Sequence, residues 1–146
     1  MKYLFPFFLF IFNISNNLFM NVKIDTKEKF CVITPEVNEI TANMSDELYK
    51  SLSYQLSKPV PHAILNLQSV EKIEDAVLTM IYEMQQKFYN DNNSFVICGI
   101  NKSILNQLEA LELIDTMNIT PSESEAWDIV QMEEIERELL NGFDEN

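Results

Sequence analysis

The sequence predicts a single α/β domain, with a mixed, mostly parallel sheet of four to five strands and about four helices. Short apolar runs typical of strands alternate along the chain with longer segments that carry apolar residues at helical spacing. This alternation favours strand–helix–strand crossovers, which make neighbouring strands parallel. A chain of 146 residues suits one core rather than two, and its 47% hydrophobic residues are enough to fill that core.

The first predicted elements are two strands and a helix. Residues 21–25 alternate polar and apolar side chains, and residues 29–34 form a second apolar segment, so the two strands can pair as a hairpin. Residues 35–44 are polar and irregular and predict a loop. Ser45 then opens a helix as its capping residue, and the helix ends before Pro59, because proline cannot continue it.

The second half of the chain alternates more regularly. Apolar runs at 62–67 and 95–100 predict central strands, and residues 117–120 predict a brief one. Three helices are expected between and after these strands. Their apolar positions are Val77, Met80, Ile81, Met84 and Phe88 in the first, Ile104, Leu105, Leu108 and Leu111 in the second, and Trp127, Ile129, Met132, Ile135 and Leu139 in the last.

The chain is strongly acidic, with a formal net charge of −13 and a pI of about 4.3. Such a charge repels phosphate backbones and anionic lipids, so we expect no nucleic-acid binding and no direct membrane contact from residues 20–146. It suits a partner with a basic patch, or it serves solubility alone. Residues 115–146 are especially acidic, which predicts a solvated helix face with an acidic tail at 142–146; a partner-binding acidic helix is the alternative.

Residues 1–19 differ from the rest, and we place the domain at 20–141. Lys2 precedes a strongly apolar run that resembles a secretory signal, although no small-x-small cleavage pattern follows it. The run is shorter than the roughly 20 apolar residues that a membrane-spanning helix needs. A signal, an anchor and a mis-assigned start upstream of Met20 are the three alternatives, and we favour the start at Met20.

Several kinds of chemistry lack their usual sequence patterns. His62 is the only histidine, and the two cysteines are not clustered in the sequence, so we expect His62 to be a structural or surface residue and expect no metal site. Gly99 and Gly142 are the only glycines, which leaves no phosphate-binding loop, and no nucleophile elbow occurs. We therefore expect neither an enzyme nor a cofactor. Cys31 and Cys98 lie in apolar runs, which favours buried free thiols and a cytoplasmic protein, with the signal-like leader as the contrary feature.

Residues 65–78, which read LNLQSVEKIEDAVL, carry the most specific pattern. They resemble the central segment of STAS domains, the anti-sigma-factor antagonist family, where a buried L-D-L-S strand precedes a loop and I-D-S-S/T-G-L at a helix start. The apolar positions that match are Leu65, Leu67, Val70, Ile73 and Leu78. The resemblance continues through 95–99 and 108–119 and covers about Met20 to Leu140. Residues 132–139 are similar to the tail of short stand-alone STAS proteins of Bacteroidetes-type bacteria.

This resemblance implies a position for the regulatory switch. In the family, a partner kinase that is also an anti-sigma factor phosphorylates the serine after the aspartate, and phosphorylation breaks the complex. By position, Glu74 stands at the aspartate, Asp75 at the phosphoacceptor, Ala76 at the second hydroxyl residue and Val77 at the glycine. All four depart from the pattern, and Asp75 has no hydroxyl group to phosphorylate.

Two interpretations are open for Asp75. It caps the helix, because aspartate is a favoured N-cap residue, or its carboxylate imitates a phosphoserine permanently, with Glu74 adding a second charge. Val77 likewise either projects bulk where a partner approaches or faces the core. Ser69 and Thr79 are the nearest hydroxyl residues, and we expect both to be ordinary loop or helix residues.

The sequence therefore predicts a non-catalytic interaction domain of a partner-switching system, with the phosphoacceptor serine replaced by Asp75. Its expected partner is an anti-sigma factor of the serine-kinase type or another regulatory protein. One alternative is a STAS-like subunit of a larger complex such as a lipid-transport ATPase. An alternative of another class is a small-molecule binding module, for which a concave polar pocket away from Asp75 would be the discriminating observation.

Overall fold

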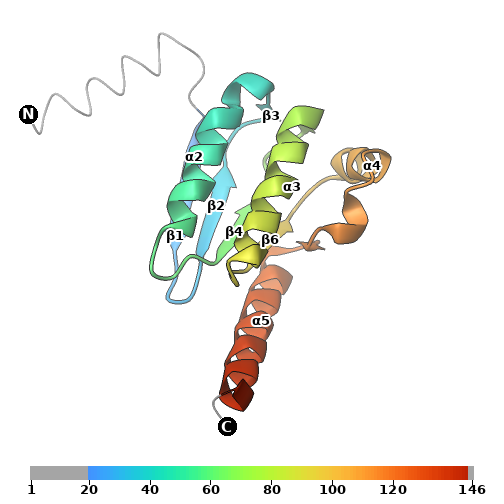
Figure 1. The fold of residues 1–146 in the computed structure, drawn as a ribbon. Helices are drawn as coiled ribbons and strands as arrows, with labels where there is room; N and C mark the ends of the chain where they lie inside the picture. The colour runs from blue at the N-terminus through green and yellow to red at the C-terminus, as the bar shows by residue number, and fades with distance from the viewer. Residues whose placement is uncertain (1–19, 145–146) are drawn as a thin grey trace, which may run out of the picture.

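The structure, a computed structural model, describes residues 20–144, so the predicted leader at 1–19 lies outside the described residues. A five-stranded sheet in the order β1-β2-β4-β6-β7 forms its centre, with β1 antiparallel to β2 and the other neighbours parallel (Figure 1). The strands are Val22–Thr26 (β1), Cys31–Pro35 (β2), Ala63–Asn66 (β4), Phe95–Cys98 (β6) and Ile119–Thr120 (β7). The predicted α/β fold and the predicted hairpin of the first two strands are confirmed.

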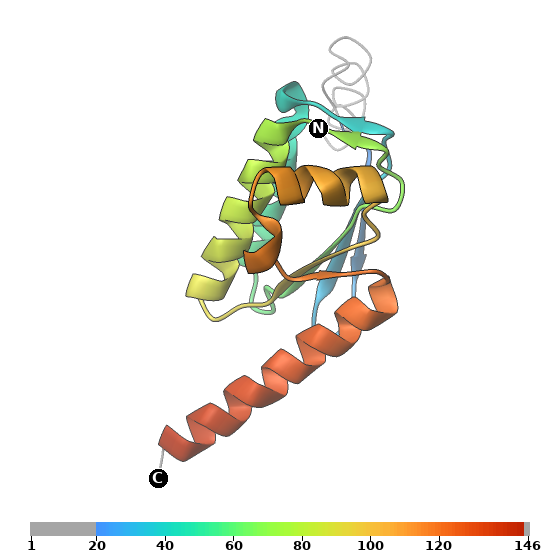
Figure 2. The same cartoon turned by 90° about the vertical axis from the view of Figure 1, so that its right-hand side faces the viewer.

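Helices cover both faces of this sheet. The α-helices of the described residues are α2 (Ser45–Leu56), α3 (Asp75–Asn90), α4 (Lys102–Ala110) and α5 (Glu123–Asp144). Successive side chains of a strand point to opposite faces, so Leu65 joins the core under α2 and α3, whereas its neighbour Ile64 joins the core under α5. Ala126 and Val130 of α5 are buried in that second core, and Figure 2 shows α5 running on past the sheet toward the C-terminus.

The loop predicted over residues 35–44 contains regular structure, so that prediction is wrong. Residues Glu39–Ile40 (β3) pair in parallel with Lys72–Ile73 (β5), and a 3₁₀ turn, η1, follows at Ala42–Met44. A second 3₁₀ turn, η2, lies at Ile114–Thr116. The β3–β5 pair lies outside the main sheet and joins the chain before α2 to the loop before α3.

Two predicted details of the helix ends need correction. Ser45 is the first residue of α2, and Met44 occupies the N-cap position without a side-chain cap bond. Helix α5 continues to Asp144, so most of the tail expected at 142–146 belongs to its last turn. At the other end of α5, Ser122 Oγ accepts a hydrogen bond of 3.2 Å from the backbone N–H of Glu125 and so caps the start of the helix.

Candidate functional site

The residues predicted to form the switch lie where the loop after β4 enters α3. Leu67 N–H donates to the carbonyl of Cys98 at 2.9 Å, and this bond ends the β4–β6 ladder. The chain then makes a turn, closed by the 3.0 Å bond from Val70 N–H to the Leu67 carbonyl, and passes through β5 into the helix. The site is therefore a short exposed loop between a buried strand and a helix N-terminus.

The segment around β3 holds this loop from one side. Backbone N–H groups of Glu71 and Glu74 donate to the carbonyls of Asn38 at 2.7 Å and Ile40 at 3.1 Å. The Glu74 carboxylate accepts a hydrogen bond from the backbone N–H of Ala42, at the start of η1. Because a charged acceptor strengthens such a bond, Glu74 fastens the helix entrance to the β3 side.

Two amide side chains of the α4 region hold the loop from the other side. Gln107 Nε2 donates to the carbonyl of Ile73 at 2.8 Å and to Asp75 Oδ1 at 2.5 Å. Asn101 Nδ2 donates to the carbonyl of Glu71 at 3.0 Å, while its Oδ1 caps α4 by accepting from Ile104 N–H at 2.8 Å. The carboxylate of Asp75 is thus directed by a neutral amide donor and not by a basic side chain.

The four positions carried over from the family divide into three exposed residues and one buried residue. Glu74, Asp75 and Ala76 are exposed, whereas Val77 is fully buried in the core under α2 and α3. Of the two interpretations left open for Val77, the structure shows the inward one, and its side chain is not available to a partner. The exposed part of the site is consequently acidic, since Glu74 and Asp75 both lie on the surface.

The interpretation of Asp75 as the N-cap of α3 is wrong by one residue. Glu74 occupies the N-cap position with an extended backbone and makes no side-chain cap bond. Asp75 follows it as the first residue of the helix. An aspartate in this turn is still favoured by the helix dipole, by about 0.3–1 kcal/mol. Its carboxylate bonds Gln107 rather than its own helix. Thr79, the nearer hydroxyl residue, donates to the Asp75 carbonyl at 3.1 Å and behaves as an ordinary helix residue.

Gln107→Ala is expected to lower the free energy of unfolding by about 1 kcal/mol, because it removes both bonds to the Ile73–Asp75 segment. Hydrogen exchange of the loop amides is expected to speed up more than exchange in the central strands. Urea denaturation and exchange mass spectrometry measure the two effects. Gln131→Ala, at an exposed position of α5, is the matched control and is expected to change neither. Unchanged loop exchange in Gln107→Ala would show that α4 does not hold the loop.

Asn66 and Gly99 pack against the start of the same loop. Asn66 Oδ1 accepts from Gln68 N–H at 3.0 Å, and its Nδ2 donates to Glu123 Oε1, also at 3.0 Å. Gly99 has a φ of +77° and lies so close that an added Cβ would stand 2.9 Å from Asn66 Oδ1. No sequence pattern indicates the Asn66–Glu123 contact, which joins residues 57 positions apart.

His62 proves to be a structural residue, one of the two roles predicted for it. It is 8% exposed, its Nδ1 accepts from Ser94 N–H at 3.0 Å, and its Nε2 lies 2.8 Å from Glu134 Oε2. Arg137 completes the network by donating to Glu134 Oε2 at 3.2 Å and to Ser94 Oγ at 2.6 Å. Burial lowers the pKa of His62, only partly opposed by the Glu134 carboxylate.

The remaining chemistry-bearing residues form no reactive cluster in the described part of the chain. Both cysteines are buried and free, and burial raises the pKa of the Cys98 thiol to about 12, so the reactive thiolate is disfavoured. Among residues 20–144, no group of three or more His, Cys, Asp or Glu side chains is arranged to hold a metal ion. Within the same residues, no helix combines the length and the apolar character that crossing a membrane requires.

Comparison with known proteins identifies the family. Residues 21–126 match the sequence model of the STAS domain. The chain belongs to the STAS domain family. No curated protein sequence matches it. The match spans the sheet, the loop that carries Asp75 and the first turn of α5, so the STAS resemblance of residues 65–78 is confirmed as part of a whole-domain relationship.

Solved structures of anti-sigma-factor antagonists share the fold at low sequence identity. An anti-sigma-factor antagonist from Mycobacterium paratuberculosis is 14% identical with a TM-score of 0.69, over 80% of this chain and 98% of that one. A putative anti-sigma-factor antagonist from Thermotoga maritima is 19% identical with a TM-score of 0.68, over 75% and 94%. The phosphorylated form of the Bacillus cell fate determinant SpoIIAA is 12% identical with a TM-score of 0.58, over 75% and 99%.

Proposed function

We propose that this STAS domain is a non-catalytic partner-binding protein of a switching system, and that Asp75 holds its switch permanently in a phosphoserine-like state. The expected partner is a regulatory protein of the anti-sigma-factor kinase type. Support comes from the family, from solved anti-sigma-factor antagonists that share the fold, and from a phosphorylated form among them. The proposal that Asp75 sets the switch permanently depends on this chain's own residues.

The observation that carries the proposal is an exposed carboxylate at the first turn of α3. Asp75 occupies the position that the resemblance gives to the phosphoacceptor, and the exposed carboxylate of Glu74 precedes it. A phosphoserine carries about −1.5 to −2 charges at pH 7. Two adjacent carboxylates supply a similar charge over a wider area. In a switch where phosphorylation separates the partners, this charge would keep the domain apart from a kinase that binds the neutral serine form.

The experiment restores the hydroxyl groups at the switch of the full chain. Candidate switch kinases from the same organism are titrated with the wild-type protein and with Asp75→Ser/Ala76→Ser, in the presence of ADP, by isothermal titration calorimetry. We expect the variant to bind one of these kinases at least about tenfold more tightly than wild type does. With ATP, the variant is expected to gain one phosphate and to be released. Val77 stays unchanged, because it is buried and its replacement by glycine would open a hole in the core.

Asp75→Asn is the matched control, since it keeps the size and the hydrogen-bonding oxygen but removes the charge. If Asp75 acts as a phosphoserine mimic, Asp75→Asn also binds the kinase more tightly than wild type. Binding that is unchanged in both variants would overturn the proposal and leave Asp75 with a structural role. Phosphate on Ser69 or Thr79 of the wild-type protein, with release of a bound partner, would also contradict a permanently set switch.

A further inference from the structure

The second half of α5 carries an apolar stripe on the side that faces away from the domain. Met132, Ile135 and Leu139 are 53%, 55% and 59% exposed, respectively. Their spacing of three and four residues places them on one helix face. At 3.6 residues per turn, this face lies roughly opposite Ala126 and Val130, which dock α5 on the sheet. The helix therefore has two apolar faces, and only one of them is used by its own domain.

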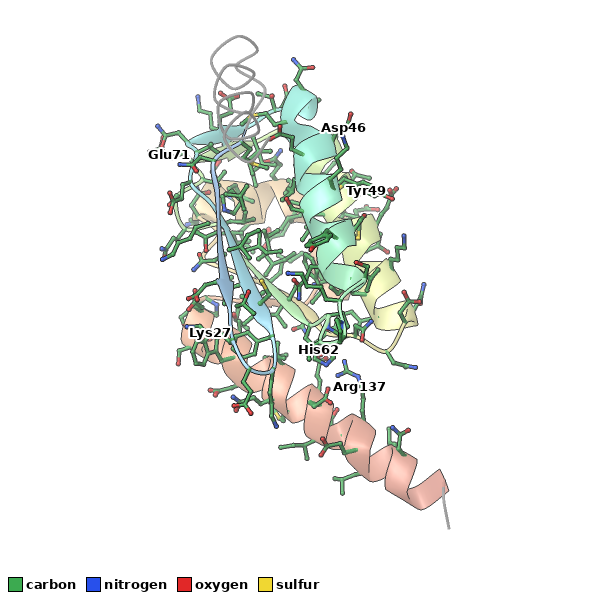
Figure 3. The ribbon with its side chains drawn as sticks, turned by 90° about the vertical axis from the view of Figure 1, so that its left-hand side faces the viewer. Lys27, Asp46, Tyr49, His62, Glu71 and Arg137 are labelled. Atoms are coloured by element: carbon green, nitrogen blue, oxygen red, sulfur yellow. The ribbon has the colours of Figure 1, made fainter. Side chains whose placement is uncertain are left out.

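Polar contacts fix the rotation of α5, so the stripe cannot turn inward. Tyr89 Oη donates to Glu133 at 2.9 Å, and His62 Nε2 lies 2.8 Å from Glu134. Arg137, one turn further along, also reaches the body of the domain, and Figure 3 shows its side chain close to His62 beside α5. Since these anchors occupy the inner face on the same turns as the stripe, Met132, Ile135 and Leu139 remain directed toward solvent.

The charges around the stripe are acidic. Asp128, Glu136 and Glu138 are exposed on α5, whereas Arg137, the only base of this helix, is engaged with Glu134 on the inner side. Two copies of the stripe brought together would place these carboxylates near one another, which opposes self-association. An apolar strip bordered by carboxylates is complementary to a helix with an apolar face and basic flanks.

We propose that the outer stripe of α5, formed by Met132, Ile135 and Leu139, is a second binding surface that takes a basic amphipathic helix of another protein. Apolar side chains of that helix cover the stripe, and its Lys or Arg residues pair with Glu136 and Glu138. The surface lies far from the switch, because α3 begins at the end of the domain opposite to the end of α5 (Figures 1 and 2). One partner at Asp75 and another at α5 can therefore be bound at the same time.

The test uses the full chain and a synthetic helix as the probe. The probe is a peptide of about 18 leucine and lysine residues, with its leucines on one helical face. Binding is followed by fluorescence anisotropy of the labelled peptide at physiological ionic strength. We expect Met132→Gln/Ile135→Gln/Leu139→Gln to weaken binding at least about tenfold. Tyr49→Gln/Tyr54→Gln removes two exposed aromatic side chains from α2 and is expected to bind like wild type. Far-ultraviolet circular dichroism confirms that each variant is folded.

A charge-reversal pair separates local complementarity from general attraction to an acidic protein. Glu136→Lys/Glu138→Lys is expected to weaken binding at least about tenfold, whereas Glu109→Lys/Asp115→Lys, with the same change in net charge at exposed positions elsewhere, is expected to weaken it much less. Equal effects of the two pairs would overturn the proposal, as would unchanged binding in the stripe variant.

A wild-type dimer by light scattering that becomes monomeric in the stripe variant would instead assign the surface to a second copy. If the full chain does not bind the peptide but a chain without residues 1–19 does, the occupant of the stripe is that segment and not another protein.

Discussion

Gly99→Ala is expected to lower the free energy of unfolding by about 2–5 kcal/mol. The glycine has a φ of +77°, a conformation in which a side chain costs about 1–2 kcal/mol. Its new Cβ would also stand 2.9 Å from Asn66 Oδ1 and 3.1 Å from the backbone nitrogen of Gln68. Asn66 cannot simply move aside, because its two amide atoms are bonded to Gln68 N–H and to Glu123. Urea denaturation followed by the fluorescence of Trp127, the only tryptophan, measures the loss.

The other glycine provides the control for this prediction. Gly142 lies in α5, where an added Cβ meets nothing within 4 Å. Gly142→Ala is expected to leave stability unchanged or to raise it by about 0.5 kcal/mol, since alanine is the better helix former. A Gly99→Ala protein as stable as Gly142→Ala would show that the end of β6 relaxes freely and that the close approach to Asn66 is not required.

The contact at Gly99 also explains how much of the fold could be predicted from sequence. Residues 95–100 were predicted as a strand ending near this glycine, because a run of apolar residues bounded by a turn signal identifies a buried strand. The same logic predicted the hairpin, β4 and α3. What packs against Gly99 could not be predicted, because the Asn66–Glu123 hydrogen bond joins residues 57 positions apart and follows no local period.

The elements that were missed are short or depend on tertiary contacts. Strands β3 and β5 have two residues each, too few for any alternation to show. The first turn of α3 was placed correctly. One of the two interpretations of Asp75 made it the N-cap, because the preference for aspartate there is general, whereas Glu74 holds the N-cap position through its bonds to Ile40 and Ala42. At the site, the family pattern predicted where Glu74 and Asp75 lie, at the start of α3. The Gln107 contact was not, because amide side chains carry no sequence signature.

Acidification from pH 8 to pH 5 is expected to destabilise the protein through His62. In the folded protein its Nδ1 accepts a backbone N–H and its Nε2 donates to Glu134, so a second ring proton has no acceptor. Burial lowers the pKa of His62 in the folded state, the nearby Arg137 lowers it further, and the carboxylates of Glu134 and Glu133 oppose the shift. The unfolded chain therefore binds a proton more readily than the folded one does.

The pH range follows from this sign. The contribution of His62 to stability is complete above the unfolded pKa of about 6.5 and is lost as the pH falls toward the folded pKa, with a slope of at most about 1.4 kcal/mol per pH unit. Because the chain has a single histidine, His62→Gln is a clean control, and its stability is expected to be flatter between pH 8 and pH 5.5. Equal pH slopes in the two proteins, or a ring pKa above 6.5 by NMR titration, would refute the assignment.

Glu134→Gln tests the balance of charges within this network. The glutamine carbonyl can still accept from His62 Nε2–H, but the negative charge that favours a protonated ring is gone. The folded pKa of His62 is therefore expected to fall further, so the loss of stability still begins near pH 6.5 but continues to lower pH than in wild type. Because a second ring proton displaces the Ser94 N–H bond and not the contact with Glu134, acidification of wild type is expected to lower the hydrogen-exchange protection factor of the Ser94 amide before those of the central strands. His62→Gln, which lacks the titrating ring, is expected to show no such early change.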